Sequence, residues 1–162
     1  MKSLLLIRHA KSSWDLDAED FDRPLNHRGQ NDAPAMAKRL IKKDVKIDCF
    51  VSSPAKRALT TARFFAEAYG LKLKDIITIP SLYEPTINAF YNAIEAFDDN
   101  FSTVAVFSHN PAITTFANQL TSFTIDDMPT CAVFAVKADG ENWKEFTSVK
   151  KEFWFFDYPK AD

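Results

Sequence analysis

The sequence has few of the residues on which several common kinds of site depend. It contains 3 glycines and 2 cysteines among 162 residues. The glycines, Gly29, Gly70 and Gly140, form neither a Walker loop nor a dinucleotide-binding fingerprint. Neither cysteine is followed six residues later by arginine, which excludes the loop of a cysteine phosphatase.

The sequence also lacks a large excess of either charge and any long apolar run. The formal net charge is −2 at pH 7, which gives no reason to expect a nucleic acid or an anionic membrane as partner. The N-terminus has too few apolar residues for a signal peptide, and no stretch is long enough to span a membrane. Cys49 and Cys131 lie in apolar runs, so we expect buried free thiols and a cytoplasmic protein.

Length and composition predict a folded domain with a substantial core. Hydrophobic residues make up 46% of the chain and charged residues 26%, which is ordinary for a globular protein. With 15 phenylalanines, aromatic rings should fill much of that core. We expect a single domain over residues 1–162, and the oligomeric state stays open.

Three short apolar runs each end in polar residues that can do chemistry. The runs are 4–7, before Arg8 and His9; 49–51, before 52–54; and 104–107, before 108–111. Short continuous apolar runs are typical of buried parallel strands. Because ligands bind beyond the carboxyl ends of such strands, we expect Arg8, His9, Arg57 and His109 to meet in one crevice.

Helical patterns separate these strands. We predict helices over 29–43, 55–69, 87–97 and 112–120, and another short strand over 76–79. Ser53 and Asn110 are expected helix N-caps, with Pro54 and Pro111 in the first helical position. Pro34 should either kink the first helix or delay its start.

The C-terminal part changes character. Strands over 132–136 and 143–149 flank Asp139 and Gly140, which is a good hairpin signal. The aromatic segment 153–158 either continues the second strand or covers a sheet edge, and a half-exposed 153–156 would be a candidate dimer interface. The whole pattern predicts an α/β fold: a three-layer α/β/α sandwich with a mostly parallel open sheet and an antiparallel C-terminal hairpin at its edge.

Two arginines and two histidines in one crevice suit phosphoryl transfer. Guanidinium groups bind phosphate with two hydrogen bonds, and the helix N-terminus that carries Arg57 favours anions. Nearby positive charge lowers the pKa of a histidine, so a neutral imidazole can act as nucleophile. The remaining groups would stabilise the equatorial oxygens in the transition state. The expected intermediate is a phosphohistidine.

Three segments together resemble the motifs of the histidine phosphatase superfamily. They are LIRHAKSS, SSPAKRALTTA and VFSHNPAI, and RPLNHRG resembles the segment that follows the catalytic loop. Small size and the closing hairpin look most like the SixA-type phosphohistidine phosphatases. The resemblance implies that His9 is the phosphorylated nucleophile and that Arg8, Arg57 and His109 complete the phosphate pocket. It also gives Ser12 a position that can help bind phosphate.

The chain departs from many members in two respects. Ala10 follows the catalytic histidine, where many members have glycine. Only 24 residues lie between Glu84 and His109, whereas larger members have a substantial insertion that covers the site. Without such a cap insertion we expect an open pocket, which suits a phosphoryl group on a protein surface better than a small sugar phosphate.

The proton donor is left open by the sequence. Glu84 resembles the position from which mutase-like members supply their donor. Four aspartates on the loop after His9 could serve instead: Asp15, Asp17, Asp20 and Asp22. Imidazole leaves phosphorus far more easily than an alkoxide does, so a phosphohistidine substrate needs less help from an acid. Arg23 is expected to pair with a neighbouring aspartate, although it could touch substrate.

Three functions follow in order of preference. The first is a metal-independent phosphatase without cofactor that acts on phosphohistidine carried by a protein. The second is a phosphatase of small phosphoesters, and the third is a non-enzymatic phosphate-binding or phosphoprotein-binding module. The three histidines have no carboxylate partners at ligand spacing, so no metal site is predicted, and we read His27 as a surface residue.

Overall fold

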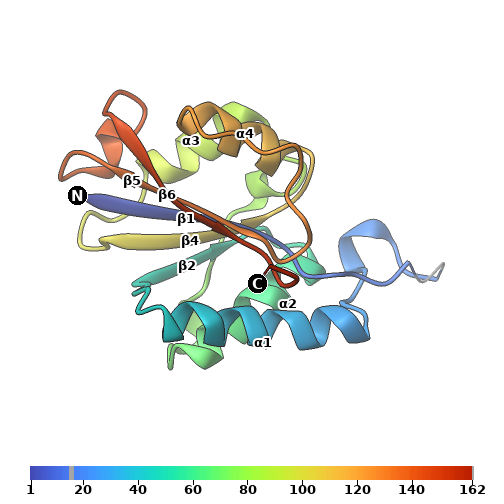
Figure 1. Cartoon of the computed structure of the whole chain (residues 1–162). Coiled ribbons are helices and arrows are strands. Elements are labelled where there is room, and N and C mark those ends of the chain that lie inside the picture. Colours follow the sequence, from blue (N-terminus) through green and yellow to red (C-terminus); the bar gives the residue numbers. More distant parts are fainter. Residues whose placement is uncertain (15–16, 162) are drawn as a thin grey trace.

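The computed structural model describes residues 1–14 and 17–161, and within them lies a six-stranded sheet of order β3-β2-β4-β1-β5-β6 (Figure 1). The strands are β1 (Lys2–Arg8), β2 (Cys49–Ser52), β3 (Ile77–Thr78), β4 (Thr103–Ser108), β5 (Val133–Ala138) and β6 (Lys151–Asp157). The first four run parallel, while β5 is antiparallel to both β1 and β6. The predicted mostly parallel sheet with an antiparallel C-terminal hairpin at its edge is therefore confirmed.

Helices cover both faces of this sheet (Figure 1). They are α1 (His27–Lys42), α2 (Lys56–Ala68), α3 (Ile87–Glu95) and α4 (Ala112–Leu120). Leu5 and Ile7 of β1 pack in the layer of α1 and α2, and Leu4 and Leu6 pack in the layer of α3 and α4. Successive strand residues point to opposite faces, so a continuous apolar run supplies both layers. The three-layer prediction is confirmed.

Aromatic rings fill much of the core, as the phenylalanine content predicts. The rings that are fully buried include Trp143, Phe50, Phe65, Phe90, Phe107, Phe116, Phe134 and Phe146. Phe90 of α3 stacks on Phe116 of α4 with 4.7 Å between ring centroids. These rings bury large apolar areas and hold the helix layers to the sheet.

The hairpin strands have different boundaries from those predicted. Segment 143–149 is not a strand, because it contains the 3₁₀ helix η4 (Trp143–Glu145). The Trp143 ring is fully buried there, and its Nε1 donates to the carbonyl of Phe101 at 2.9 Å. The second strand is β6, so the aromatic segment 153–156 forms the outer edge of the sheet with half-buried side chains.

Two helices begin later, relative to their prolines, than predicted. α2 begins at Lys56, and the Ser53 Oγ accepts from the backbone N–H of Ala55 rather than capping a turn that starts at Pro54. α4 begins at Ala112, with Pro111 itself in the N-cap position. Both helices therefore start after their proline, and the prediction that proline fills the first helical position is wrong.

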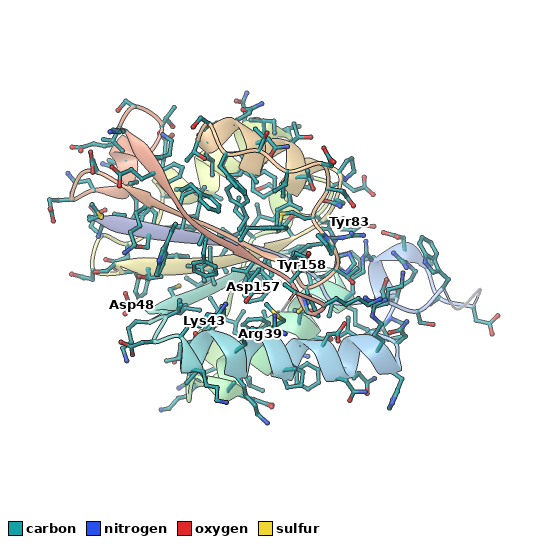
Figure 2. All side chains as sticks on the ribbon, in the orientation of Figure 1. Arg39, Lys43, Asp48, Tyr83, Asp157 and Tyr158 are labelled. Carbon is teal, nitrogen blue, oxygen red and sulfur yellow. The ribbon has the colours of Figure 1, made fainter. Side chains whose placement is uncertain are left out.

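α1 is longer than predicted at its N-terminus. It starts at His27 because the side chain of Asn26 caps it, accepting from the backbone N–H of Gly29 at 2.9 Å. Pro34 lies inside the helix and does not delay its start. Two cations hold the buried carboxylate of Asp157 at the end of β6 (Figure 2). Arg39 lies in the last turn of α1, and Lys43 is the residue directly after this helix.

The remaining connections contain short 3₁₀ helices: η1 (Asp20–Asp22), η2 (Leu73–Asp75) and η3 (Pro80–Leu82). Cys49 and Cys131 are buried free thiols, as predicted. Within residues 1–14 and 17–161, none of the helices combines the length and the apolar character needed to cross a membrane.

Candidate active site

The candidate site lies where the neighbouring strands β1, β2 and β4 end. Parallel register sets Arg8 beside Ser108 across β1 and β4. His9 follows β1 directly, His109 follows β4 directly, and the N–H of His9 donates to the carbonyl of Ser108 at 3.1 Å. Two histidines that are 100 positions apart in the chain thus meet, with 5.3 Å between ring centroids.

A cavity of about 780 Å³ opens above this meeting point. All the site residues predicted from the sequence line it: Arg8, His9, Ser12, Arg57, Glu84 and His109. The predicted convergence at one crevice is therefore observed. The cavity is also lined by residues of the segment after His9, among them Trp14, Asp20 and Arg23.

The backbone around His9 fixes the protonation of its ring. Nδ1 lies 2.7 Å from the carbonyl oxygen of Ala10, and a carbonyl can only accept a hydrogen bond. Nδ1 therefore carries the proton, and Nε2 keeps its lone pair. Burial lowers the pKa of His9 to about 3, helped by the charges of Arg57 and Arg8, so the ring is neutral at physiological pH.

A buried threonine ties this loop to α2. The hydroxyl of Thr61 accepts from the N–H of Ala10 at 3.0 Å and donates to the carbonyl of Arg57 at 2.7 Å. Thr61 is fully buried, so neither bond competes with water. One side chain thus connects the residue after the nucleophile to the helix turn that carries Arg57.

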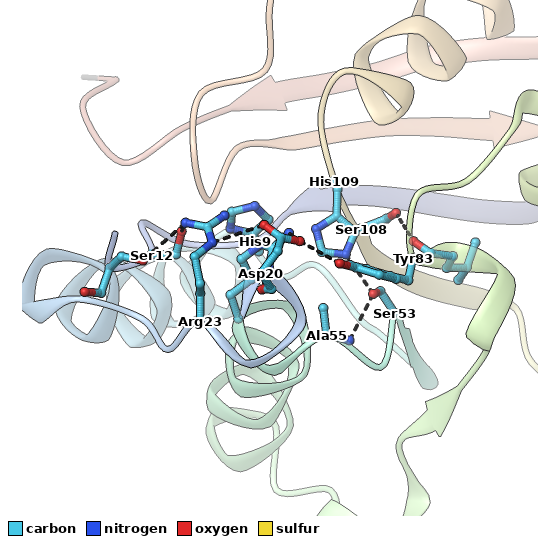
Figure 3. Close-up of polar contacts among 12 residues, drawn as sticks. His9, Ser12, Asp20, Arg23, Ser53, Ala55, Tyr83, Ser108 and His109 are labelled. Atoms are coloured by element: carbon cyan, nitrogen blue, oxygen red, sulfur yellow. Dashed lines mark hydrogen bonds and ion pairs between the residues drawn. The ribbon is translucent and has the colours of Figure 1, made fainter. Parts of the chain in front are cut away.

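His109 is held from the opposite side by Ser53. Its Nε2 lies 2.7 Å from the Ser53 Oγ, which also accepts from the backbone N–H of Ala55 (Figure 3). Burial, together with the charge of Arg57, lowers the pKa of His109 to about 4. Both imidazoles of the site are therefore neutral and fixed in orientation.

Three buried side-chain nitrogens have no hydrogen-bond partner in the described part of the chain. They are the Nε of Arg8, the Nε of Arg57 and the Nδ1 of His109. Buried polar groups are nearly always hydrogen-bonded, and the three residues all line the cavity, so their unsatisfied nitrogens support a site for a polar ligand there. A tetrahedral oxyanion offers acceptors to such a set.

Comparison with known proteins agrees with this geometry. The sequence profile of the histidine phosphatase superfamily (branch 1) matches residues 4–91. An uncharacterized chloroplastic protein of Arabidopsis thaliana is 31% identical over 153 residues, which cover 89% of this chain and 70% of that protein. The chain belongs to the histidine phosphatase superfamily. Membership supports phosphatase activity.

Solved structures show the same fold. The protein histidine phosphatase SixA, solved with tungstate, superposes with a TM-score of 0.83 at 22% identity over 97% of both chains. A mycobacterial glucosyl-3-phosphoglycerate phosphatase gives a TM-score of 0.68 at 15% identity, over 94% of this chain and 96% of that one. The fold of this superfamily member is thus SixA-like.

Two of the five carboxylates considered as proton donor line the cavity, namely Glu84 and Asp20. Asp17 and Asp22 are not among its lining residues, and Asp15 lies outside the described residues. A hydrogen bond from the Tyr83 hydroxyl is the main cause that lowers the pKa of Asp20 to about 2. Asp20 is therefore ionised and has no proton to give in this arrangement.

Glu84 stands at an unusual point of the backbone. Its φ is 51°, in the left-handed region that non-glycine residues seldom adopt, and its side chain is exposed at the cavity wall. The preceding residue, Tyr83, lies edge-on to the His109 ring with 5.7 Å between centroids. Such local strain is concentrated at functional sites, which agrees with the place of Glu84 in the cavity wall.

Arg23 pairs with a neighbouring aspartate, as predicted, and also holds Ser12. Its Nε pairs with the Asp20 carboxylate at 3.2 Å, and its Nη1 donates to the Ser12 hydroxyl at 2.9 Å (Figure 3). The guanidinium also lies 3.8 Å from the centroid of the Trp14 ring. Ser12 is thus held by Arg23, and the pair forms one wall of the cavity.

Sequence reasoning missed several residues that build the site. Tyr83, Thr61, Ser53 as partner of His109, and Trp14 were not singled out. The motif that contains Ser53 and Thr61 was recognised, but a buried hydroxyl contact depends on how two segments approach each other. Within the described residues, no cluster of three or more histidine, cysteine, aspartate or glutamate side chains could hold a metal ion.

Proposed function

We propose that the protein is a phosphatase that works through a covalent phosphohistidine on His9 and acts on phosphohistidine carried by another protein. The observation that carries the proposal is the neutral His9 ring, with its Nδ1 proton held by Ala10 and its Nε2 lone pair kept, beside two guanidinium groups. Pure anion binding needs no such nucleophile, which argues against a non-enzymatic binding module.

The proposed reaction has two displacements at phosphorus. In the first, the Nε2 lone pair of His9 forms an N–P bond while the bond from phosphorus to the substrate nitrogen breaks. The substrate ring carries a proton on its other nitrogen, so it takes the electron pair of the broken bond and leaves as neutral imidazole, while His9, with its Nδ1 proton, becomes a phosphoimidazolium. In the second, a water oxygen bonds to phosphorus, the N–P bond to His9 breaks, and the water releases a proton to solvent. Inorganic phosphate and the original imidazole result.

The phosphoryl oxygens have proposed partners on three sides. Arg8 and Arg57 supply positive charge, and His109 supplies a neutral ring N–H. Ser12 adds a hydroxyl oriented by Arg23. In the transition state these groups would stabilise the charge that develops on the three equatorial oxygens.

The open entrance supports a protein substrate. Between Glu84 and β4, the described chain supplies one helix, α3, and no large cap. The entrance is lined by exposed side chains, including Trp14 with 74% of its surface exposed. The fold likeness to SixA, described as a protein histidine phosphatase, points the same way. Buried free thiols are compatible with the proposed cytoplasmic location.

Glu84 is the proposed proton donor for leaving groups poorer than imidazole. It lines the same cavity as His9, and the ion pairs that engage Asp20 leave Glu84 as the better candidate. Glu84→Gln should therefore slow hydrolysis of an alkyl phosphate by about a hundredfold and hydrolysis of phosphohistidine far less. A small-phosphoester enzyme would instead lose its best activity with this substitution.

The deciding experiment is turnover of a phosphohistidine-bearing protein with a chelator present. His9→Ala should lower turnover by about a thousandfold or more, and His27→Ala, at an exposed histidine outside the cavity, serves as the matched control. The covalent intermediate should be trapped in alkali, because P–N bonds are acid-labile. Wild-type turnover by His9→Ala would contradict the mechanism, and faster turnover of sugar phosphates or nucleotides would favour the small-phosphoester alternative.

A further inference from the structure

The phosphate-binding arginine of α2 already holds an anion of its own chain. Arg57 Nη1 donates to the backbone carbonyl of Asp20 at 2.6 Å, and Arg57 Nη2 donates to the Asp20 carboxylate at 3.1 Å. Both terminal nitrogens of the guanidinium are thus engaged by one residue. These are the two donors that would bind a phosphoryl group side by side.

Two further donors hold the same carboxylate. The Tyr83 hydroxyl donates to Oδ2 at 2.6 Å, and Arg23 Nε donates to Oδ1 at 3.2 Å. Figure 3 shows Asp20 between Arg23 and Tyr83, close to the rings of His9 and His109. The carboxylate is therefore bound much as a ligand anion would be bound, at the edge of the catalytic cavity.

The Asp20 side chain nevertheless keeps 51% of its surface exposed. Ion pairs that remain in contact with water are weak, so a stronger anion can displace this one. A phosphoryl dianion carries about twice the charge of a carboxylate and more acceptor oxygens, and it would also repel Asp20 from the shared guanidinium.

We propose that Asp20 is a resident anion, which competes with the phosphoryl group for Arg57 and so sets the affinity of the pocket for phosphate. This inference rests on the proposed function, because it takes Arg57 as a phosphate ligand. A carboxylate in this place weakens the binding of product phosphate and of weakly charged anions. It thereby favours the release of product phosphate.

Equilibrium binding of inorganic phosphate, measured by titration calorimetry at pH 8, tests the inference without any turnover. Asp20→Asn should lower the Kd for phosphate by about fivefold, the scale expected for a partly exposed charge. Tyr83→Phe keeps the carboxylate of Asp20 but removes one of the donors that hold it beside Arg57. This variant should therefore also lower the Kd for phosphate, but by less than Asp20→Asn. It also provides a second variant should Asp20→Asn not fold.

The matched control is Glu19→Gln, which removes the same charge one residue away, from a side chain outside the cavity lining. Its Kd should stay within about twofold of wild type, since an exposed charge beyond contact distance is largely screened. An equal or higher Kd for Asp20→Asn would overturn the inference, and so would equal tightening by Glu19→Gln. Absence of phosphate binding in every variant would overturn the phosphate pocket as well, whereas normal binding with no turnover would contradict the proposed function alone.

Discussion

At the floor of the pocket, His9 and His109 are each only 6% exposed and follow neighbouring parallel strands directly. At the rim, Trp14 is 74% exposed and the side chain of Asp20 is 51% exposed, both on the segment between β1 and α1. The floor therefore derives its geometry from sheet register and buried hydrogen bonds. The rim derives its geometry from contacts between polar side chains in water, which bind more weakly and rearrange more easily.

Acid should act on the two regions in different pH windows. In the unfolded chain the histidines take up protons below about pH 6.5, whereas in the folded protein His109 does so only near pH 4 and His9 near pH 3. The free energy of unfolding should fall across that interval, by roughly 3 kcal/mol for His109 and roughly 5 kcal/mol for His9. Asp20 has a lowered pKa of about 2, so its stabilising contribution is lost only between about pH 4 and pH 2.

Histidine ring NMR signals and urea unfolding, both followed from pH 7 to pH 4, check this prediction. The His9 and His109 signals should stay at neutral-imidazole positions down to about pH 5, while stability declines. Titration of both rings near pH 6.5 would contradict the buried, neutral pair.

Gly29 of α1 lies against the backbone of Lys11, in the segment that leads from the floor to the rim, and should tolerate no side chain. A Cβ there would lie 2.1 Å from the carbonyl oxygen of Lys11, which is itself fixed by a hydrogen bond from the N–H of Asn26. Gly29→Ala should cost about 3 kcal/mol or more of unfolding free energy, because backbone rather than a flexible side chain must move.

The matched control for Gly29→Ala is Gly70→Ala. Gly70 has a φ of +73°, and nothing lies within 4 Å of its added Cβ, so only backbone strain of about 1 kcal/mol is expected. Urea unfolding compares the two variants. Equal losses would show that the close approach of Lys11 to α1 is not fixed.

Thr61→Val probes the floor alone. It leaves the buried N–H of Ala10 without an acceptor and should cost about 1–3 kcal/mol. Because Ala10 also fixes the His9 ring, turnover should fall by about tenfold. Thr60→Val is the control, since the Thr60 hydroxyl donates only to a carbonyl within its own helix at the exposed side. Unchanged turnover in Thr61→Val would show that the bond from Ala10 to Thr61 is not needed to orient His9.

Trp14→Ala probes the rim and should have the smallest effect. The ring is exposed, so stability should change by less than about 0.5 kcal/mol. Loss of the ring over Arg23 should raise KM for a phosphohistidine protein by about threefold, and leave KM for a small aryl phosphate unchanged. Leu73→Ala, exposed and away from the cavity, is the control. An equal change for both substrates would show that Trp14 acts inside the pocket rather than at its entrance.

The sequence alone determined the floor. Uninterrupted apolar runs that end in Arg8-His9 and Ser108-His109 are typical of buried parallel strands, and parallel strands bring their carboxyl ends to one edge. The resemblance to a known superfamily, carried by the same short motifs, identified the same residues. Local pattern sufficed because a short continuous apolar run already marks a strand buried on both faces, and the polar residues that follow it then lie at the carboxyl edge of the sheet.

Only the tertiary structure decided the rim and the C-terminal edge. The pairing of Asp20 with Arg57 and Tyr83 joins three segments whose separation in sequence gives no signal of contact. The segment 143–149, predicted as a strand, instead contains the 3₁₀ helix η4, because burial of Trp143 against Phe101 outweighs the local hairpin pattern. Side-chain contacts between distant segments depend on the distances and angles of the finished fold, which periodicity along one segment cannot specify.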